Sequence, residues 1–526
     1  MTKAFGISVF LFLQLCYHAD SCPKGCQCFT PSKVFCSEDV LKDMPQNLSS
    51  DVQELVIMTT SIKCIHPESF PLNSSLTKLM LLNNLLSGVS EMAFNPLVEL
   101  KELEISGNRN FKVLGTETFK RLGNLTKLLL NYNQLKTLDD SIFASLQKLE
   151  ILQLKGNAIN HLPRPLFHRL LWLRSLDFSE NKILTLDKDL FNSLLVLETL
   201  RMNHNVISVL HPDTFINTPR LKELGLQGNR IEDLHLNLLS GLEHLNKLHL
   251  RGNLITKIAP GTFPPNLKEL NLEDNRLVEL SVGVFQHMSF LADLVLTKNR
   301  LSTIPEDVFR NLTSLQHLSL SANHLLALPP AAFTGLSNLI SIHLDKNNIS
   351  SLEAELFDDQ EIMEKLYLSD NELQTLPEGF FIPLISLRVV RLHGNPWKCD
   401  CHMHDFHDWL TDANLPMSDV EKISCAKPKS LKGRGLVFLN REQLVCPESA
   451  VNDHPVSTGD KRHRTKSCSL HEMNGKVSIQ CAVPRCPEVK LEVQFSDEDG
   501  RRLTFADEQK RSNSTQCNNT TIILNF

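Results

Sequence analysis

The sequence predicts an α/β solenoid, a right-handed horseshoe of stacked coils with a parallel sheet along its concave side. Two periodic features predict it. The pattern L-x-x-L-x-L-x-x-N-x-L recurs between residues 76 and 395, and its Asn returns every 24 residues, with one step of 25 and one of 22. A Phe recurs in the same register and is missing only from the copy near Leu239. Since one copy cannot bury its own Leu side chains, the copies must stack to form a shared core.

Each periodic position has a physical role in such a coil. The short strand points alternate Leu side chains inward, and the Phe returns from the convex side to stack on its neighbours. The Asn amide both donates and accepts hydrogen bonds, so it can satisfy turn backbone groups in adjacent coils. An array of amphipathic helices is excluded, because Leu spacings of three and then two beside a fixed Asn do not fit a period of 3.6. A period of this length is typical of leucine-rich repeats.

The repeats should occupy residues 51–394 and number about 15. The first copy, residues 52–62, is degenerate, because Thr60 stands where the Asn is expected. The shortest copy, residues 254–275, contains three Pro residues. We expect a tighter, irregular convex segment there rather than a break in the array.

The ends of an open solenoid need caps, and cysteine clusters flank the repeats on both sides. We assign residues 21–50 to an N-terminal cap and residues 395–447 to a C-terminal cap. Even-numbered clusters behind a signal peptide indicate disulfides formed in an oxidising compartment. Spacing alone leaves three pairings open for each cap. The cysteines are Cys22, Cys26, Cys28 and Cys36 in the first cap and Cys399, Cys401, Cys425 and Cys446 in the second.

The first residues are typical of a secretory signal peptide, which we assign to residues 1–20. Lys3 provides the positive start, residues 4–15 are almost wholly apolar, and the small Ala19 follows. This run of about 12 residues is too short for a membrane span, which needs about 20. No second long apolar run follows. We therefore expect a secreted, extracellular protein without a membrane anchor.

Two further segments follow the second cap. Residues 448–466 are polar and contain a short basic run, as in a flexible, protease-sensitive linker. Residues 467–526 regain the alternation of apolar and polar residues and predict a small β module. A module this short needs covalent cross-links to be stable, because its hydrophobic core is small. Its four cysteines can provide disulfides: Cys468, Cys481, Cys486 and Cys517.

One cysteine stands outside these groups. Cys64 lies in the first repeat, at a position that should be exposed. An odd cysteine in a secreted protein is a free or capped thiol or forms an intermolecular disulfide, and we predict the first.

Asn-X-Ser/Thr sequons predict N-glycosylation, in agreement with an extracellular location. They begin at Asn47, Asn73, Asn124, Asn311, Asn348, Asn513, Asn518 and Asn519. Asn518 and Asn519 are adjacent, so we expect only one of them to carry a glycan.

No catalytic, metal or cofactor motif occurs in the sequence. Metalloprotease, nucleophile-elbow and P-loop patterns are missing, and a formal net charge of −6 argues against a dedicated nucleic-acid binder. His402, His404 and His407 lie beside cysteines that the cap disulfides should consume, so we predict exposed histidines on the cap helix rather than a metal site. We therefore expect no enzyme activity and no cofactor, and a function that resides on a surface.

The concave face offers uneven chemistry from end to end. The first coils present apolar residues where side chains should face outward, and contiguous exposed apolar surface often marks an interface. Coverage by the N-terminal cap or by a glycan is the alternative. Further on, a basic band around Lys247 lies beside an acidic band around Glu269; such bands either steer a partner or form an ordinary solvated face. The candidate partner-binding residues are Val56, Met58, Met80, Leu82, Leu129 and Tyr132.

The caps and repeats together resemble the extracellular leucine-rich-repeat proteins. The first cap matches their pattern in Cys-x3-Cys-x-Cys-x7-Cys (residues 22–36), and the second in Asn-Pro-Trp-x-Cys-x-Cys (residues 395–401). Over nearly its whole length, the chain resembles the large regulatory subunits of plasma carboxypeptidase N. The segments that carry this likeness are residues 394–401, 431–433 and 439–447 and the tail KSCSLHEMNGKVSIQCAVPRC at residues 466–486.

This resemblance implies a disulfide pairing, a partner and a role. The implied disulfides are Cys22–Cys28, Cys26–Cys36, Cys399–Cys425 and Cys401–Cys446. The implied partner is a catalytic zinc carboxypeptidase subunit, which such a non-catalytic, glycosylated plasma subunit binds, stabilises and retains in circulation. The implied assembly is a hetero-oligomer of two heterodimers, whose enzyme removes C-terminal Lys or Arg from peptides.

Other functions stay open from the sequence. A soluble adhesion or decoy protein that binds a matrix protein or growth factor would share the caps and repeats, but the stapled tail and the lack of a membrane span count against it. An innate pattern-recognition module would need an anion- or lipid-selective patch on the concave face, and none is obvious. A hydrolase ranks last, because the motifs present assemble no nucleophile, base and orienting group.

Overall fold

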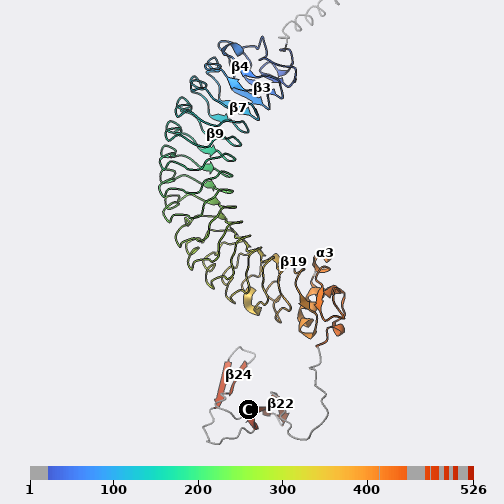
Figure 1. Cartoon of the computed structure of the whole chain (residues 1–526). Helices are drawn as coiled ribbons and strands as arrows, with labels where there is room; N and C mark the ends of the chain where they lie inside the picture. Colours follow the sequence, from blue (N-terminus) through green and yellow to red (C-terminus); the bar gives the residue numbers. More distant parts are fainter. Residues whose placement is uncertain are drawn as a thin grey trace, which may run out of the picture. The chain divides into compact units, whose positions relative to one another are not determined.

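The computed structural model describes residues 22–413 and 415–446, and beyond them the backbone of five strands between Cys468 and Asn525. The chain divides into two units, residues 1–447 and residues 448–526. In the first unit, successive coils stack into an arc whose strands line the inner edge (Figure 1). This confirms the predicted solenoid, with a long parallel sheet and a disulfide-bonded cap at each end.

One sheet of 17 strands runs along the first unit. The two strands of the N-terminal cap pair antiparallel, and the repeat strands pair in parallel, one per coil. The strands are β1 (Cys26–Thr30), β2 (Lys33–Cys36), β3 (Glu54–Met58), β5 (Lys78–Leu82), β7 (Glu102–Ser106), β8 (Lys127–Leu129), β9 (Ile151–Gln153), β10 (Ser175–Asp177), β11 (Thr199–Arg201), β12 (Glu223–Gly225), β13 (Lys247–His249), β14 (Glu269–Asn271), β15 (Asp293–Val295), β16 (His317–Ser319), β17 (Ser341–His343), β18 (Lys365–Tyr367) and β19 (Val389–Arg391).

The core lies between this sheet and the rest of each coil. The strands bury their central Leu side chains, and Leu128, Leu152 and Leu176 align across three neighbouring strands. The Phe side chains form a second column whose rings stack from coil to coil; the ring centroids of Phe285 and Phe309 are 6.1 Å apart. Burial of this apolar surface, at roughly 25 cal/mol per Å², is the main stabilising contribution. Each coil depends on both neighbours for it.

Between the strands of the main sheet, the chain forms turns rather than long helices. The array stays unbroken at the shortest copy, where β13 and β14 pair in parallel with Lys247 opposite Glu269. Cys64 is half-buried rather than exposed as the sequence suggested, because the next coil pairs with its strand. The short elements in this region are η1 (Pro67–Ser69), η2 (Ala354–Phe357) and the paired strands β4 (Cys64–Ile65) and β6 (Gly88–Val89).

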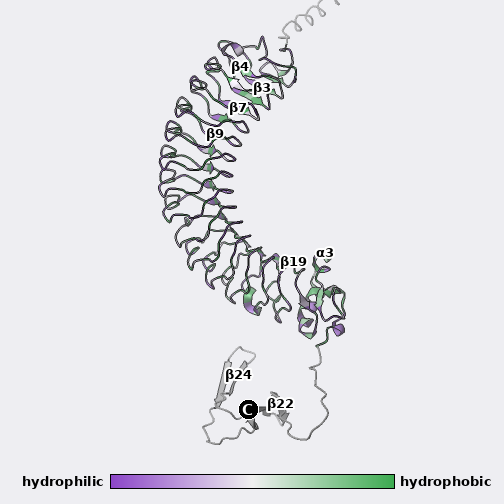
Figure 2. Ribbon diagram, in the orientation of Figure 1, coloured by the Kyte–Doolittle hydropathy of each residue, from purple (hydrophilic) through white to green (hydrophobic). Residues whose placement is uncertain are grey.

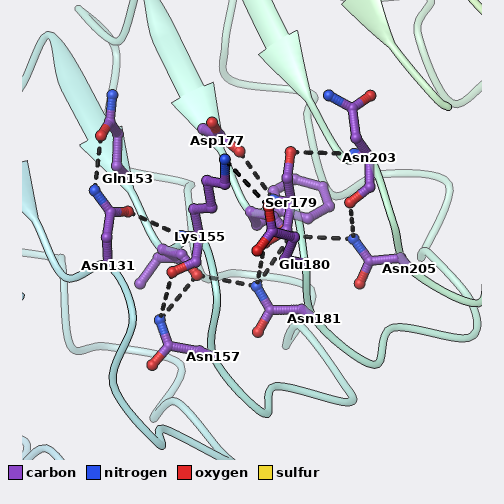
Figure 3. Close-up of polar contacts among 12 residues, drawn as sticks. Asn131, Gln153, Lys155, Asn157, Asp177, Ser179, Glu180, Asn181, Asn203 and Asn205 are labelled. Carbon is purple, nitrogen blue, oxygen red and sulfur yellow. Dashed lines mark hydrogen bonds and ion pairs between the residues drawn. The ribbon is translucent and has the colours of Figure 1, made fainter. Parts of the chain in front are cut away.

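The periodic Asn side chains form a hydrogen-bond ladder through the coils (Figure 3). Asn181, for example, accepts at Oδ1 from Ile159 N–H (3.0 Å) and donates from Nδ2 to Leu154 O (2.9 Å). The same carbonyl also accepts from Asn157 Nδ2 (2.9 Å). Each Asn thereby satisfies backbone groups of two coils where the strand ends and the turn begins.

The residue just before each ladder Asn has a left-handed backbone in every coil from Asn83 to Gly394, with φ between 52° and 74°. The turn demands this conformation, whatever residue occupies the position. Gly stands there in five coils, and the others carry residues with side chains. For those residues the conformation costs roughly 1–2 kcal/mol each.

Each end of the sheet is closed by a cap. In the first, β2 continues the sheet next to β3 and buries Val34 and Cys36 over the first coil. In the second, Trp397 is fully buried and donates from Nε1 to Leu392 O (3.0 Å). The disulfides have the pairing that the family resemblance implies: Cys22–Cys28, Cys26–Cys36, Cys399–Cys425 and Cys401–Cys446. The elements of the second cap are β20 (Trp397–Lys398), η3 (Cys401–Met403), α2 (His404–Asp412), α3 (Met417–Val420), β21 (Cys425–Lys427), η4 (Leu436–Phe438) and η5 (Arg441–Gln443).

The histidines of the second cap are less exposed than the sequence suggested. His407 is buried on α2, where its Nε2–H donates to Leu439 O (2.8 Å). His404 is half-buried and donates to Leu444 O (3.0 Å), whereas His402 is exposed. The prediction of exposed histidines is therefore wrong for His407, because α2 packs this side chain against the segment around Leu439.

Helices are few and short in the described residues. The longest is α2, with nine residues. None of them has both the length and the apolar character that crossing a membrane requires.

The second unit consists of strands in its described parts. β23 pairs antiparallel with both β22 and β26, and β24 pairs antiparallel with β25. The backbone register sets Cys468 opposite Cys481. The predicted disulfides of these two residues, and of Cys486 and Cys517, fall outside the described side chains, as the predicted signal peptide and linker fall outside the described residues. The strands are β22 (Cys468–Met473), β23 (Lys476–Pro484), β24 (Leu491–Ser496), β25 (Arg502–Asp507) and β26 (Asn519–Asn525).

Candidate binding surface on the concave sheet

The outward side chains of the main sheet form parallel rows along its concave face: two along the three-residue strands, and a third where β3 and β5 are longer. In β3 the first, third and fifth residues are half-buried, while the second and fourth are buried in the core. The strand register then aligns like positions of successive coils. We name the rows after their residues in β3: the first row passes through Glu54, the middle row through Val56 and the third row through Met58.

Apolar side chains gather at the N-terminal end of the middle and third rows. Val56 lies opposite Met80 in the middle row, and Met58 lies opposite Leu82 in the third. Phe35 of the cap extends the middle row by one strand, and Figure 2 shows hydrophobic colouring at β3. These five half-buried residues form the apolar patch. Among its described residues, the N-terminal cap adds Phe35 to this patch, and the ring of Phe29 in β1 lies 6.3 Å from that of Phe35, between centroids.

Four of the six sequence-predicted partner-binding residues therefore lie together. Leu129 lies in the same middle row but is separated from Met80 by Glu104. Tyr132 lies in the turn that follows β8. Sequence analysis missed Phe35, although its alternation with buried neighbours in β2 is the signal of an outward-facing residue.

A shallow hollow beside the patch contains an unpaired carboxylate. The hollow lies between Met80 and Leu129, with Glu104 in its wall. Glu104 forms no ion pair with any described residue, whereas Glu102, in the first row, lies 3.9 Å from the ammonium groups of two lysines. A half-buried carboxylate between apolar side chains can pair with a cation that arrives from outside. The surface thus favours a partner with Lys or Arg beside apolar residues.

The first row carries a ladder of alternating charges beside the patch. Lys33 Nζ lies 3.0 Å from Glu54 Oε2, and Lys78 Nζ lies 3.4 Å from Glu54 Oε1. The pKa of Glu54 is held below its ordinary value, chiefly by Lys33 and further by Lys78, against the opposing effect of partial burial. The ladder continues through Glu102 to Lys127. Because these charged groups are paired with one another, none of them is free to pair with a ligand. They form the border of the apolar patch.

We expect Glu54→Gln to lower the free energy of unfolding by less than about 1 kcal/mol near pH 7. Because the folded state has the lower pKa, the stabilisation is complete above the unfolded-state pKa and is lost as the pH falls through the folded-state pKa. Denaturation of both proteins near pH 7 and near pH 3 measures this difference. Glu104→Gln is the control, since its carboxylate has no described cation to lose. An equal loss in the control would contradict the ladder.

Tyr132 is exposed near the patch in a strained conformation. Its φ is 53°, in the left-handed position that precedes the ladder Asn. Its ring lies against Gly156 of the next coil, where an added Cβ would come within 2.4 Å of the ring, and Lys155 Nζ lies 5.7 Å from the ring centroid. Every coil imposes this conformation on the residue before its ladder Asn, so the backbone does not single out Tyr132. Its exposed ring, in the turn after β8, makes Tyr132 a candidate contact residue.

We expect Tyr132→Gly and Tyr132→Ala to weaken partner binding equally but to differ in stability. Both variants lose the ring, and only Gly relieves the left-handed backbone, so the Gly variant should be more stable than the Ala variant by about 1 kcal/mol. Denaturation and binding are measured on the same preparations. Equal stabilities would show that the backbone is not strained, and unchanged binding in both would remove Tyr132 from the surface.

Beyond the apolar patch, many side chains of the concave face are polar and hydrogen-bond to one another (Figure 3). Asn131 Nδ2 donates to Gln153 Oε1 (2.8 Å), and Lys155 Nζ lies 3.2 Å from a carboxylate oxygen of Glu180. These groups already have partners, so a ligand would have to replace bonds that exist. The apolar patch has no such bonds to lose.

The charge bands predicted around Lys247 and Glu269 are not separate patches. These two side chains form an ion pair with each other across β13 and β14, and Arg251 lies 3.4 Å from Glu273. The pKa of Lys247 is raised, chiefly because Glu269 accepts its hydrogen bond. Lys247 and Glu269 meet because they have the same register position in neighbouring strands. Asp293, opposite Glu269 on its other side, forms no ion pair with a described residue.

Among the described residues, one group has the composition of a metal site: Cys401, His402 and Cys446. Both cysteines are joined in a disulfide, so neither offers a thiolate ligand. The group therefore belongs to the structure of the cap.

The described sequons lie outside the three outward rows. Asn124 is half-buried; its Nδ2 donates to Val98 O (3.0 Å) and its Oδ1 accepts from Lys148 Nζ (2.8 Å). Glycosylation stays a prediction at every site, and of Asn513, Asn518 and Asn519 no side chain is described. The sequon side chains that are exposed are those of Asn47, Asn73, Asn311 and Asn348.

Comparison with known proteins adds a family and a relative. A family model described as leucine rich repeat matches eight stretches that together run from residue 50 to residue 396. Carboxypeptidase N subunit 2 of Homo sapiens is 35% identical over 131 residues, which is 22% of this chain and 23% of that protein. The match thus spans about a quarter of the length of this curated relative.

Solved structures share the fold. A leucine-rich-repeat protein of Leptospira interrogans has a TM-score of 0.62 at 28% identity, over 72% of this chain and 94% of its own. A chain in the Toll–Spatzle complex of Drosophila has a TM-score of 0.65 at 22% identity, over 80% of this chain and 65% of its own. These likenesses cover 72% and 80% of this chain and show a shared fold.

Proposed function

Because this chain belongs to the leucine-rich repeat family, we propose that it is an extracellular, non-catalytic protein that binds another protein with its concave sheet. Leucine-rich-repeat proteins bind protein partners and are generally non-catalytic. The observation that carries the proposal is the apolar patch at the N-terminal end of the sheet, from Phe35 to Leu82. Its five half-buried side chains keep part of their apolar surface exposed, as expected of the centre of an interface.

The proposed partner is the catalytic subunit of a zinc carboxypeptidase, which this chain would stabilise in plasma within a hetero-oligomer. Support comes from the similarity to carboxypeptidase N subunit 2, a subunit of that enzyme by name, and from the cap and tail segments that resemble such subunits. The proposal reaches beyond the matched quarter of the chain, so a direct capture experiment has to decide it.

The charges around the apolar patch favour a partner that carries Lys or Arg at the proposed contact. Glu104 interrupts the middle row between two apolar residues and has no cation among the described residues. A Lys or Arg of the partner would satisfy it while apolar neighbours fill the patch. The alternating Lys and Glu residues of the first row border the patch. A partner that placed the same charges opposite them, Lys against Lys and Glu against Glu, would be repelled.

The test is capture of the tagged, secreted chain from plasma of the source organism. Bound proteins are identified by mass spectrometry, and the captured material is assayed for release of C-terminal Lys or Arg. A Met80→Lys variant, captured in parallel, is the matched control because it adds one charge to the centre of the patch.

Three outcomes are informative. A basic carboxypeptidase captured with activity by the parent chain and not by the variant supports both the partner and the patch. Capture by both proteins supports the partner and moves its site away from the patch. Capture of a matrix protein or growth factor, or of nothing, overturns the carboxypeptidase proposal and favours the adhesion or decoy function instead.

A further inference from the structure

Two successive coils carry an apolar turn on the flank where the strands of the main sheet begin. Most coils close this turn with a backbone hydrogen bond just before the strand, such as N–H of residue 173 to O of residue 170 (3.2 Å) and N–H of residue 197 to O of residue 194 (3.1 Å). The central residues of these two turns form the flank patch: Leu171 and Trp172 in one coil, and Leu195 and Val196 in the next.

The flank patch differs from the same turn in every other described coil that forms it. Elsewhere at least one of the two central residues is polar, as beside Phe290 and Ile362, whose turn neighbours are Ser and Glu. In the flank patch, Leu171, Trp172 and Leu195 are 56%, 60% and 53% exposed, and the fourth residue is half-buried. Contiguous exposed apolar surface marks an interface, and Trp is among the residue types most enriched at the energetic centre of one.

A row of alternating charges runs beside the flank patch. It consists of one residue from each of four successive coils, and each N–H donates to the backbone O of the residue before it at 2.8 Å: Glu150, Arg174, Glu198 and Lys222. Arg174 Nη1 lies 2.6 Å from Glu198 Oε1, and Lys222 Nζ lies 2.7 Å from Glu198 Oε2. Glu150 is exposed and forms no ion pair with a described residue. Read from its other end, the row has the opposite order of charges, so it is complementary to its own reverse.

We propose that the flank patch is the contact surface between two copies of this chain, related by a two-fold axis that crosses the array between its two coils. One copy then sets Leu171 and Trp172 against Leu195 and Val196 of the second copy, and the second copy does the same in return. Such a contact needs a surface that is complementary to itself. The proposal is independent of which protein the concave sheet binds.

The charge row meets this requirement about the same axis. Glu150 faces Lys222 of the second copy, and Arg174 faces Glu198 of the second copy, so every charge of the row meets its opposite. A copy that lay in the same direction would set Glu against Glu and cation against cation, which disfavours that alignment. Exposed ion pairs contribute little affinity. The apolar turns therefore supply the attraction, and the charge row fixes the orientation.

One pair of cations also meets across this axis. Lys148 and Arg220 occupy the second central position of the turns just before and just after the flank patch. Lys148 Nζ donates to Asn124 Oδ1 (2.8 Å) in the preceding coil, so its charge is drawn away from the contact. Asn124 also begins a predicted sequon at the rim of this surface, and the test therefore uses the secreted, glycosylated chain.

Sedimentation equilibrium of the full chain secreted by animal cells, over dilutions from about 50 µM, tests the contact. We expect the parent to approach twice the monomer mass at the highest concentration, and Trp172→Ser to raise the dissociation constant of the dimer at least ~10-fold. Phe290→Ser is the matched control and should dimerise as the parent does, since Phe290 is 57% exposed at the same turn position of another coil. A monomeric parent, or equal dissociation constants for the parent and Trp172→Ser, overturns the proposal.

Two charge reversals test the two-fold geometry. Glu150→Lys places a Lys opposite Lys222 of the second copy, and Lys222→Glu places a Glu opposite Glu150, so each variant alone should dimerise about 5-fold more weakly than the parent. In an equimolar mixture, each Lys of one variant meets a Glu of the other, and dimers should form about as tightly as in the parent. A mixture that dimerises no better than the separate variants also overturns the proposal.

Discussion

Asn323→Ala is expected to lower the free energy of unfolding by about 3 kcal/mol. Asn323 is buried; its Oδ1 accepts from Leu301 N–H (3.1 Å), and its Nδ2 donates to Leu296 O and Leu320 O, both at 3.0 Å. The variant loses these bonds and leaves a buried N–H without a partner.

The expected loss of unfolding free energy depends on how many backbone groups the variant leaves without a hydrogen-bond partner. Each of the two carbonyls that Asn323 binds accepts from two Asn side chains, so losing one of them leaves the other. Leu320 O also accepts from Asn347 Nδ2 (3.0 Å), and Leu296 O also accepts from Asn299 Nδ2 (3.0 Å). Both carbonyls therefore keep one donor, and only the amide of Leu301 is orphaned. Without this sharing, three unsatisfied groups would cost more, on the order of 3–9 kcal/mol.

Hydrogen exchange at Leu301 N–H, together with chemical denaturation, measures the effect. Asn338→Ala is the control, because Asn338 also reaches the previous coil, donating to Thr313 O (2.8 Å), but is exposed. We expect the control to stay within about 0.5 kcal/mol of the parent. If the two variants lose equal stability, buried Asn side chains do not couple the coils.

Periodic residues let much of the fold be predicted, because each of them solves the same physical problem in every coil. The Leu spacing predicts strands, the Phe predicts a stacked second column, and the Asn predicts bonds between coils. Fifteen-fold repetition separates these signals from chance, and the caps follow from exposed ends that need cover. The register of the sheet then aligns Val56 with Met80 and Met58 with Leu82, so most of the candidate site follows from the period as well.

Features that differ between coils, or that depend on contacts between distant residues, could not be predicted from the repeat and are seen in the structure. The left-handed backbone at Tyr132 is visible in the sequence only by comparison with the Gly that precedes the ladder Asn in other coils, such as Gly156. The sequence predicts a basic and an acidic band around Lys247 and Glu269, because these residues are 22 positions apart along the chain. In the structure the two side chains form an ion pair across neighbouring strands. His407 was expected outside because its spacing to the cap cysteines says nothing about which face of α2 is buried.

Met80→Lys is expected to weaken partner binding at least ~100-fold, on the order of 3 kcal/mol. Met80 is at the centre of the apolar patch, with Val56 on one side and the hollow of Glu104 on the other. A lysine there would have to be desolvated at the interface or would pair with Glu104 and remove the charge that the partner is proposed to meet. Binding to the captured partner, by titration of purified proteins, measures the loss.

Val295→Lys provides the matched control. Strand pairing from β5 to β15 places Val295 in the same middle row as Met80, and both side chains are half-buried on the concave face. The two variants therefore introduce the same group in the same row and at similar burial, at two positions along the arc. Loss of binding in Met80→Lys alone places the partner at the N-terminal end. Equal loss in both would mean that the partner lies along the whole concave sheet, and the apolar patch would then not be its principal contact.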